Sequence, residues 1–203
     1  QSQVQPKIDF DFASGIRTLM RQDPDIIMVG EIRDLDTAEM AIQAALTGHL
    51  VLSTLHTNDA PTAITRLLDL GVPAHLIRVT LNGVMAQRLV RTLCHHCKVP
   101  TQAAEWEPLV RPWKVKSPEQ LYKPVGCLEC RNTGFLGRQG IYEILPVNES
   151  IKPLITADAD ISALRIQAMK EGMRTLRLSG AQKVGAGLTS VEEVMRVAPE
   201  SGK

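Results

Sequence analysis

All four cysteines of the chain fall into two closely spaced pairs. Cys94 and Cys97 form one C-x-x-C motif, and Cys127 and Cys130 form a second one after 29 intervening residues. Two such turns present four thiolates, and a tetrahedral site of four sulfurs is one that zinc favours. A zinc site closed by four thiolates is structural rather than catalytic. The pattern therefore predicts one structural zinc ion bound by these four residues.

Two disulfides or four free thiols are the alternatives to a zinc site. Disulfides are disfavoured in a cytosolic protein, and a thioredoxin-like motif would leave the second pair unexplained. The stretch between the pairs is longer than the usual spacing of about 15 to 20 residues. We therefore expect it to have structure of its own, with Trp106, Trp113 and Leu121 packing there. His95 and His96 are expected to be bystanders rather than ligands.

Two more residues able to do chemistry follow short apolar runs. Glu31 comes after the run at residues 26–29, and His56 comes after the run at residues 50–55. If both runs are parallel strands, these side chains lie at the same edge of a sheet, where α/β proteins bind ligands. A carboxylate there can orient a water for attack on a phosphate. The alternative is that Glu31 is a helix cap or surface charge and that His56 is structural. His49 precedes the second run and is expected near the opposite edge.

Apolar periodicity and capping residues predict the elements that position these groups. Strands at residues 26–29 and 50–55 alternate with helices, which favours an α/β fold with a parallel sheet of fully buried strands. Asp36 and Glu39 resemble a capping box that opens a helix ending at Gly48, and Asp59 caps a helix ending at Gly71. The other expected elements are helices at 15–21, 74–90, 160–172 and 174–186, a last helix capped by Ser190, and a strand at 140–145.

The composition is that of an ordinary globular protein and excludes some functions. Hydrophobic residues make up 44% and charged residues 22% of the chain, with a net charge of +1 and 3% aromatics. This balance offers neither the basic surface nor the stacking side chains that nucleic-acid binding needs. No apolar run reaches the roughly 20 residues that a transmembrane helix requires. We expect a cytosolic fragment, because the chain begins at Gln1 rather than at a methionine.

Two long motifs resemble those of a known family. The segment RQDPDIIMVGEIRD at residues 21–34 and the segment TGHLVLSTLHTNDA at residues 47–60 resemble the Walker B and histidine boxes of the motor ATPases of type II secretion and type IV pilus assembly. The AQRL segment at residues 86–89 and the paired cysteines also fit. The similarity runs from about residue 5 to about residue 198.

The resemblance implies a fold and a set of site residues. The fold would be the C-terminal portion of a RecA-like P-loop ATPase core (residues 1–90), a zinc-binding tetracysteine subdomain (91–140), and a returning strand with a C-terminal helical part (141–203). By position, Glu31 matches the catalytic Walker B glutamate. His49 and His56 match the two histidines of the histidine box, which would sense phosphate or a neighbouring subunit. Candidate interface or nucleotide contacts, with surface arginines as the alternative, are Arg17, Arg21 and Arg33.

The resemblance also implies a function. The full-length protein would be a homo-hexamer that hydrolyses ATP with Mg²⁺ and drives protein secretion or pilus assembly. It would be cytoplasmic, peripheral at the inner membrane of a bacterium, and would act with an inner-membrane platform. The 203 residues contain no G-x-x-x-x-G-K-[ST] phosphate-binding loop, so we expect this part alone to be inactive. The alternative is a non-catalytic, zinc-stabilised interaction module that docks to the membrane platform.

Overall fold

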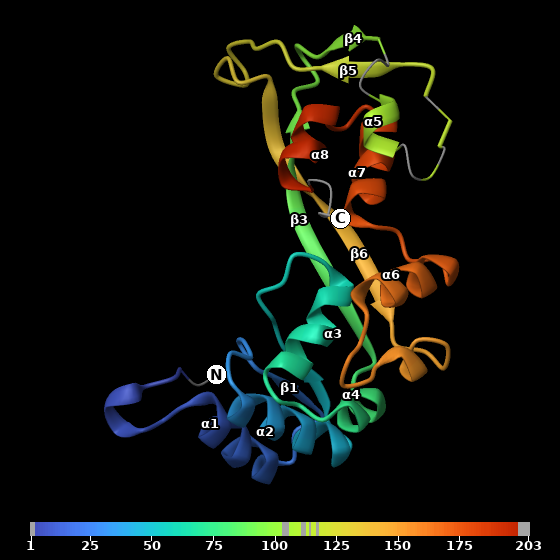
Figure 1. Cartoon of the computed structure of the whole chain (residues 1–203). Coiled ribbons are helices and arrows are strands. Elements are labelled where there is room, and N and C mark those ends of the chain that lie inside the picture. Colours follow the sequence, from blue (N-terminus) through green and yellow to red (C-terminus); the bar gives the residue numbers. More distant parts are fainter. Residues whose placement is uncertain (1–2, 103–105, 111–112, 114, 117, 199–203) are drawn as a thin grey trace. The chain divides into compact units, whose positions relative to one another are not determined.

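The structure is a computed structural model that describes residues 3–102, 106–110, 113, 115–116 and 118–198. It contains two compact units (Figure 1): unit 1 comprises Gln1–Val84 and Leu145–Glu171, and unit 2 comprises Met85–Ile144 and Gly172–Lys203. Two of the three boundaries along the chain lie within strands, β3 (Gly83–Leu93) and β6 (Phe135–Pro146). The chain therefore passes between the units along these two strands, and a third time between Glu171 and Gly172.

Unit 1 is an α/β arrangement around two parallel strands. β1 (Ile26–Met28) pairs with β2 (Leu50–Leu52), with Ile26 opposite Leu50 and Met28 opposite Leu52. The alternation of strands and helices predicted from the sequence is confirmed in this unit. Its helices are α1 (Phe12–Leu19), α2 (Leu35–Leu46), α3 (Ala60–Asp69), α4 (Ala74–Thr80) and α6 (Ile161–Lys170), with 3-10 turns at Pro6–Ile8, Met20–Gln22 and Lys152–Leu154.

One face of the parallel strands forms the core of the segment that carries Glu31. Side chains from β1, α1 and α2 meet there, which holds the strands against the two helices. The buried members are Ile16, Ile27, Val29 and Ala44, and the partly buried side chains packed against them are Phe12, Met20, Met40 and Val51.

The other face of these strands is exposed, so the prediction of fully buried strands is wrong for this chain. Ile26 and Met28 are 58% and 74% exposed, and Leu50 and Leu52 are 47% and 48% exposed. Alternate residues of a strand point to opposite faces, so these four side chains form one apolar face. Their composition is typical of parallel strands that are covered on both faces, whereas in this chain only one face is covered.

Aspartates begin the helices on either side of β2. The Asp34 carboxylate accepts a hydrogen bond from Thr37 N at 2.8 Å and caps α2, so the predicted capping box of Asp36 and Glu39 is wrong by two residues. Asp36 lies instead in the first turn, where an acidic side chain favours the helix dipole. The prediction for Asp59 is confirmed, because its carboxylate accepts from Thr62 N at 3.0 Å at the start of α3.

The single helix predicted for residues 74–90 is wrong. Helix α4 ends at Thr80, and β3 begins at Gly83 after Asn82. Val147 N donates to Asn82 O at one end of the strand pair, and Cys94 N donates to Gly134 O at the other. These contacts show that β3 and β6 run antiparallel. The strand predicted for residues 140–145 is confirmed as part of β6. Residues 83–90 form a strand rather than a helix because they pair with this long strand.

The described part of unit 2 combines this ribbon with a small second ribbon and three helices. β4 (Val99–Thr101) pairs antiparallel with β5 (Leu121–Lys123). The helices are α5 (Trp106–Val110), α7 (Leu176–Gly185) and α8 (Val191–Val197). Trp106 and Leu121 are buried, as predicted for the stretch between the cysteine pairs, and α5 and β5 pack against α7. The Trp113 Nε1 atom is buried without a partner among the described residues.

A buried carboxylate attaches α8 to β3. Glu193 accepts hydrogen bonds from Arg91 N at 2.9 Å, from the Arg91 guanidinium at 2.7 Å and from the Arg196 guanidinium at 2.7 Å. Burial alone would raise the pKa of the Glu193 carboxyl, but the two arginines lower it to about 2. Glu193 is therefore ionised in the folded unit although its side chain is only 1% exposed.

Candidate functional site

Hydrogen bonds beyond β1 and β2 bring Glu31 and His56 to the same edge of the sheet. Val29 N donates to Leu52 O at 2.8 Å, and Ile32 N donates to Thr54 O at 3.0 Å. The Thr54 hydroxyl donates to Gly30 O at 2.6 Å. The two segments therefore stay side by side past the strand ends, which places their next side chains together at the carboxyl edge.

Glu31 lies between a histidine and an arginine. Its Oε2 atom is 3.0 Å from His56 Nε2, and its Oε1 atom is 2.6 Å from a terminal nitrogen of Arg33. The Glu31 side chain is 21% exposed, whereas His56 and Arg33 are 86% and 69% exposed. The structure thus brings together Glu31 and His56, as their positions after the two strands predicted, and adds Arg33.

The arginine favours the ionised form of the glutamate. The hydrogen bond from Arg33 holds the pKa of Glu31 below its ordinary value; burial opposes this shift, and the hydrogen bond with His56 reinforces it. An ionised carboxylate only accepts hydrogen bonds, so it can bind and orient a water molecule. The backbone before it is closely packed, since a side chain at Gly30 would meet the Phe12 ring at 3.2 Å.

His49 lies apart from this pair, as its place before β2 predicted. Its Nδ1 atom is 2.9 Å from Ala44 O, in the last turn of α2, and 3.0 Å from the hydroxyl of Thr47, the residue that ends the helix. Its backbone N also donates to Ala44 O. The ring therefore closes the C-terminal end of α2, at the amino end of β2 rather than at the carboxyl end that carries Glu31.

In unit 2 the four cysteines converge. Their Sγ atoms lie within 4.8 Å of one another, and three of the sulfur–sulfur distances are 3.9 Å for Cys94–Cys127, 3.8 Å for Cys97–Cys130 and 3.7 Å for Cys127–Cys130. Four sulfurs about 2.3 Å from a zinc ion at tetrahedral angles are about 3.8 Å apart, whereas disulfide sulfurs are bonded at about 2.05 Å. The cysteines are free and fit a tetrahedral metal ion.

Backbone N–H groups point at two of the sulfurs. Gly126 N donates to Cys97 Sγ at 3.3 Å, and Cys127 N and Gly134 N each donate to Cys130 Sγ at 3.2 Å. Burial would raise the pKa of the Cys130 thiol, but these two N–H groups contribute to lowering it to about 6. Gly126 and Gly134 have φ values of +123° and +75°, and a side chain at Gly134 would overlap Pro124. Glycine is therefore required at both positions.

The comparison with protein families assigns the chain. A family model described as "Type II/IV secretion system protein" matches residues 1–196. The chain belongs to this family. A curated relative, the type IV pilus assembly ATPase TfpB of Acinetobacter baylyi, is 57% identical over 201 residues, which cover 98% of this chain and 34% of the relative. The type II secretion system ATPase E of Vibrio cholerae is 49% identical over 201 residues, or 99% of this chain and 40% of the relative.

Solved structures share the fold of this family member. The pilus retraction motor PilT with bound ADP has a TM-score of 0.64 and 28% identity over 94% of this chain and 44% of that chain. The ATPase DotB of Yersinia pseudotuberculosis has a TM-score of 0.67 and 22% identity over 98% of this chain and 42% of that chain, a likeness of fold alone. The predicted RecA-like α/β core is confirmed. The chain spans only about a third to two fifths of its curated relatives.

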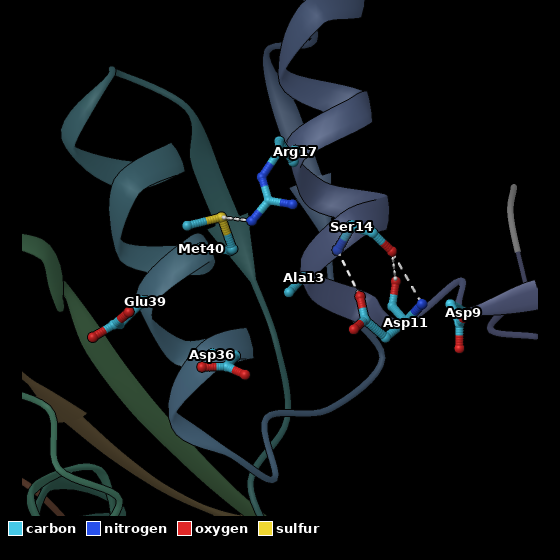
Figure 2. A pocket seen from close by; sticks show the side chains of 8 residues that line it. All are labelled: Asp9, Asp11, Ala13, Ser14, Arg17, Asp36, Glu39 and Met40. Atoms are coloured by element: carbon cyan, nitrogen blue, oxygen red, sulfur yellow. Dashed lines mark hydrogen bonds between the residues drawn. The ribbon is translucent and has the colours of Figure 1, made fainter. Parts of the chain in front are cut away.

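The remaining arginine candidates lie away from Glu31. Arg17 lines an open pocket of about 340 Å³ between α1 and α2, where a terminal nitrogen lies 3.7 Å from Met40 Sδ (Figure 2). Asp11 in this pocket already caps α1 through Ser14 N at 2.7 Å. Arg21 is exposed in the 3-10 turn after α1.

Among the described helices, none combines the length and apolar character of a membrane span.

Sequence reasoning missed two features of these sites. It treated Arg33 as an interface or nucleotide contact, although the spacing of two residues from Glu31 on an extended segment allows a direct ion pair. It also assigned no role to Gly126 and Gly134. A glycine directly before Cys127 and another four residues after Cys130 were the available signal, since tight turns around a metal site need positive φ.

Proposed function

We propose that this chain is the C-terminal part of an ATP-hydrolysing motor that powers type II protein secretion or type IV pilus assembly. The observation that carries the proposal is the pairing of Glu31 with His56 at the carboxyl edge of two parallel strands, the edge at which α/β folds bind ligands. Membership of the family and the names of both curated relatives support it.

In this proposal Glu31 orients the water that attacks the terminal phosphate. Water orientation requires the ionised carboxylate, and the lowered pKa of Glu31 further favours that form. The exposed His56 side chain is hydrogen-bonded to Glu31 through Nε2. In this proposal it senses phosphate when that hydrogen bond to Glu31 is replaced by one to a phosphate oxygen. The sensing role of His49 stays a prediction, and its place at the far end of β2 suits contact with a neighbouring subunit better than contact with Glu31.

We further propose that residues outside this chain complete the nucleotide site. The 203 residues contain no phosphate-binding loop, and the apolar face of Ile26, Met28, Leu50 and Leu52 needs a cover that a longer protein supplies. The full-length protein would bind ATP and Mg²⁺, assemble as a homo-hexamer and act in the cytoplasm against an inner-membrane platform. The tetracysteine centre would hold structural zinc.

Replacing Glu31 with Gln in the full-length protein tests the catalytic proposal. The amide keeps the shape but loses the charge that orients water, so kcat for ATP hydrolysis should fall about 100-fold or more while nucleotide affinity is retained. Glu39→Gln is the matched control, because Glu39 is an exposed glutamate of α2. Hydrolysis by Glu31→Gln within a few fold of the parent would remove Glu31 from this role.

Calorimetric titration of the isolated chain with Mg-ATP tests the proposed division of the nucleotide site. Without a loop that directs backbone N–H groups and a lysine at the phosphates, we expect no saturable binding and no turnover. An affinity in the micromolar range would show that the chain holds its own nucleotide site. The second proposal would then be wrong, whereas the role of Glu31 would be unaffected.

A further inference from the structure

The segment that carries His56 leads from β2 to α3 at the carboxyl edge of the sheet. A backbone hydrogen bond holds it beside the Glu31 segment at Thr54, whose carbonyl accepts from Ile32 N at 3.0 Å. Helix α3 then begins at Ala60, directly after its capping residue Asp59. The His56 side chain is 86% exposed. Because so little of the protein packs around this ring, its position depends on how the short stretch between β2 and α3 is held.

Asp59, at the end of this stretch, is held from two sides. Its Oδ1 atom accepts hydrogen bonds from Thr62 N at 3.0 Å and from the Thr62 hydroxyl, both in the first turn of α3. Its Oδ2 atom accepts a hydrogen bond from a terminal nitrogen of Arg165 at 2.6 Å. The Asp59 carbonyl accepts from the Thr57 hydroxyl at 3.3 Å. Asp59 is therefore bonded both to α3 and to the residue that follows His56.

Arg165 reaches Asp59 from a helix that lies 106 residues further along the chain. This helix, α6, packs against α3 within unit 1 (Figure 1). Leu164, directly before the arginine, is fully buried. The Arg165 and Asp59 side chains are 26% and 14% exposed. Water and salt therefore screen this ion pair less than a pair of fully exposed side chains.

The ion pair is separate from the cap of α3. A capping side chain needs one oxygen, and an asparagine caps a helix about as well as an aspartate. Arg165 binds the other oxygen of Asp59, so it adds an attachment to α6 that the cap does not require. Two oxygens held from different helices fix the orientation of the Asp59 side chain, and with it the direction from which the chain enters α3.

We propose that Arg165 is a positioning residue for His56. Through Asp59 it holds the stretch between β2 and α3 in the conformation that places the His56 ring beside Glu31. This role rests on the function proposed above, in which Glu31 orients the attacking water and His56 senses the phosphate. A displacement of about 1 Å at a group that contacts the reacting atoms lowers the rate even when its cause lies far from the chemistry. Helix α6 thereby contributes to turnover through a residue remote from the sheet edge.

Three substitutions separate the ion pair from the helix cap. Arg165→Met removes the guanidinium and keeps an unbranched side chain. Arg165→Lys keeps a positive charge that can make the single hydrogen bond. Asp59→Asn keeps a capping oxygen but loses the carboxylate that pairs with the arginine. Arg66→Met is the matched control, because Arg66 is an exposed arginine of α3.

Steady-state ATP hydrolysis by the full-length protein is the first measurement. Arg165→Met and Asp59→Asn should each lower kcat about tenfold with little change in KM, and the double variant should be no slower than either, because both changes break the same pair. Arg165→Lys should keep most of the parent rate, and Arg66→Met should keep all of it.

A second background separates positioning from stability. In a His56→Ala protein, Arg165→Met should cause no further loss of kcat, because the side chain that it positions is gone. An arginine that only stabilised the fold would lower kcat by the same factor in both backgrounds.

Amide hydrogen exchange of the nucleotide-free protein gives a readout that does not depend on activity. Arg165→Met should raise the exchange rate at residues 56–62 about fivefold, the effect of losing an ion pair at the upper end of the range for such pairs. Helix α2 should keep its protection, and Arg66→Met should leave both segments unchanged.

Different results would contradict the motor function and the role of Arg165. Hydrolysis by Glu31→Gln close to the parent rate would remove the proposed function together with the role that rests on it. With Glu31→Gln inactive, an unchanged kcat or unchanged exchange in Arg165→Met would overturn the role of Arg165 alone. An equal loss of kcat with and without His56 would do the same. If Asp59→Asn does not fold, the comparison of Arg165→Met with Arg165→Lys decides by itself.

Discussion

Glu193 shows how one buried carboxylate can carry a pH dependence. Its pKa is lowered from 4.5 to about 2, because Arg196 and Arg91 outweigh the effect of burial. In the unfolded chain the carboxyl binds a proton as the pH falls through about 4.5, whereas in the folded unit it does so only near 2. The stabilisation is therefore complete above about 4.5 and is lost as the pH falls from there towards 2.

Replacing Glu193 with Gln tests this at the residue scale. The amide cannot pair with two guanidinium groups, so the free energy of unfolding at pH 7 should fall by about 2 kcal/mol, and its decrease between pH 4.5 and 2 should become shallower. Urea unfolding at several pH values measures both. Glu192→Gln is the control. Glu192 is adjacent to Glu193 but exposed, so this substitution should change the free energy of unfolding by less than about 0.5 kcal/mol. Equal behaviour of the two variants would contradict the assignment.

Helix α2 joins the two strand ends, so its first residue decides how β1 leads into β2. Asp34, rather than Asp36, provides the cap, because the backbone at Asp34 is extended and its carboxylate reaches Thr37 N. Because Asp34 and Asp36 are only two residues apart, the sequence does not specify which of the two caps the helix. Only the backbone conformation resolves this, since the cap must lie outside the helix.

The cap is tested by a pair of alanine variants. Asp34→Ala should lower the free energy of unfolding by about 1 kcal/mol, because Thr37 N loses its acceptor. Asp36→Ala should cost only a few tenths of a kcal/mol through the helix dipole. Chemical denaturation of both variants under identical conditions gives the comparison. A larger loss for Asp36→Ala would restore the capping box predicted from the sequence.

At the scale of the whole molecule, the tetracysteine cluster joins segments that are distant in the chain. Cys94 follows β3, and Gly134, whose carbonyl accepts from Cys94 N, precedes β6. Lys98, directly after the first pair, donates to Gly187 O at 2.8 Å beyond α7. A metal ion held by the cysteines therefore stabilises the ribbon end and its attachment to the C-terminal helices, all within unit 2.

We expect about one zinc ion per chain after purification under reducing conditions without added metal. Removal of that ion by a chelator should speed amide hydrogen exchange at β6 near Phe135 and around Gly187, while α2 in unit 1 keeps its protection. Elemental analysis and exchange mass spectrometry measure the two effects. A folded chain with a zinc content near zero would refute the metal site. Cys97→Ser should reproduce the pattern caused by the chelator.

The sequence by itself determined which side chains meet at the two candidate sites and much of the local structure. Paired cysteines, strand-end residues and a capping aspartate act over a few positions, so their patterns predicted the cluster of four cysteines, the edge shared by Glu31 and His56, and the start of α3. Tertiary structure decided what depends on distant partners. Residues 83–90 are a strand because β6 pairs with them, and Arg33 engages Glu31 through a side-chain conformation that spacing does not specify. The N–H groups that donate to the sulfurs of Cys97 and Cys130 depend on the fold of both turns. Such pairings bring together atoms that are far apart in the chain, and local sequence patterns carry no record of them.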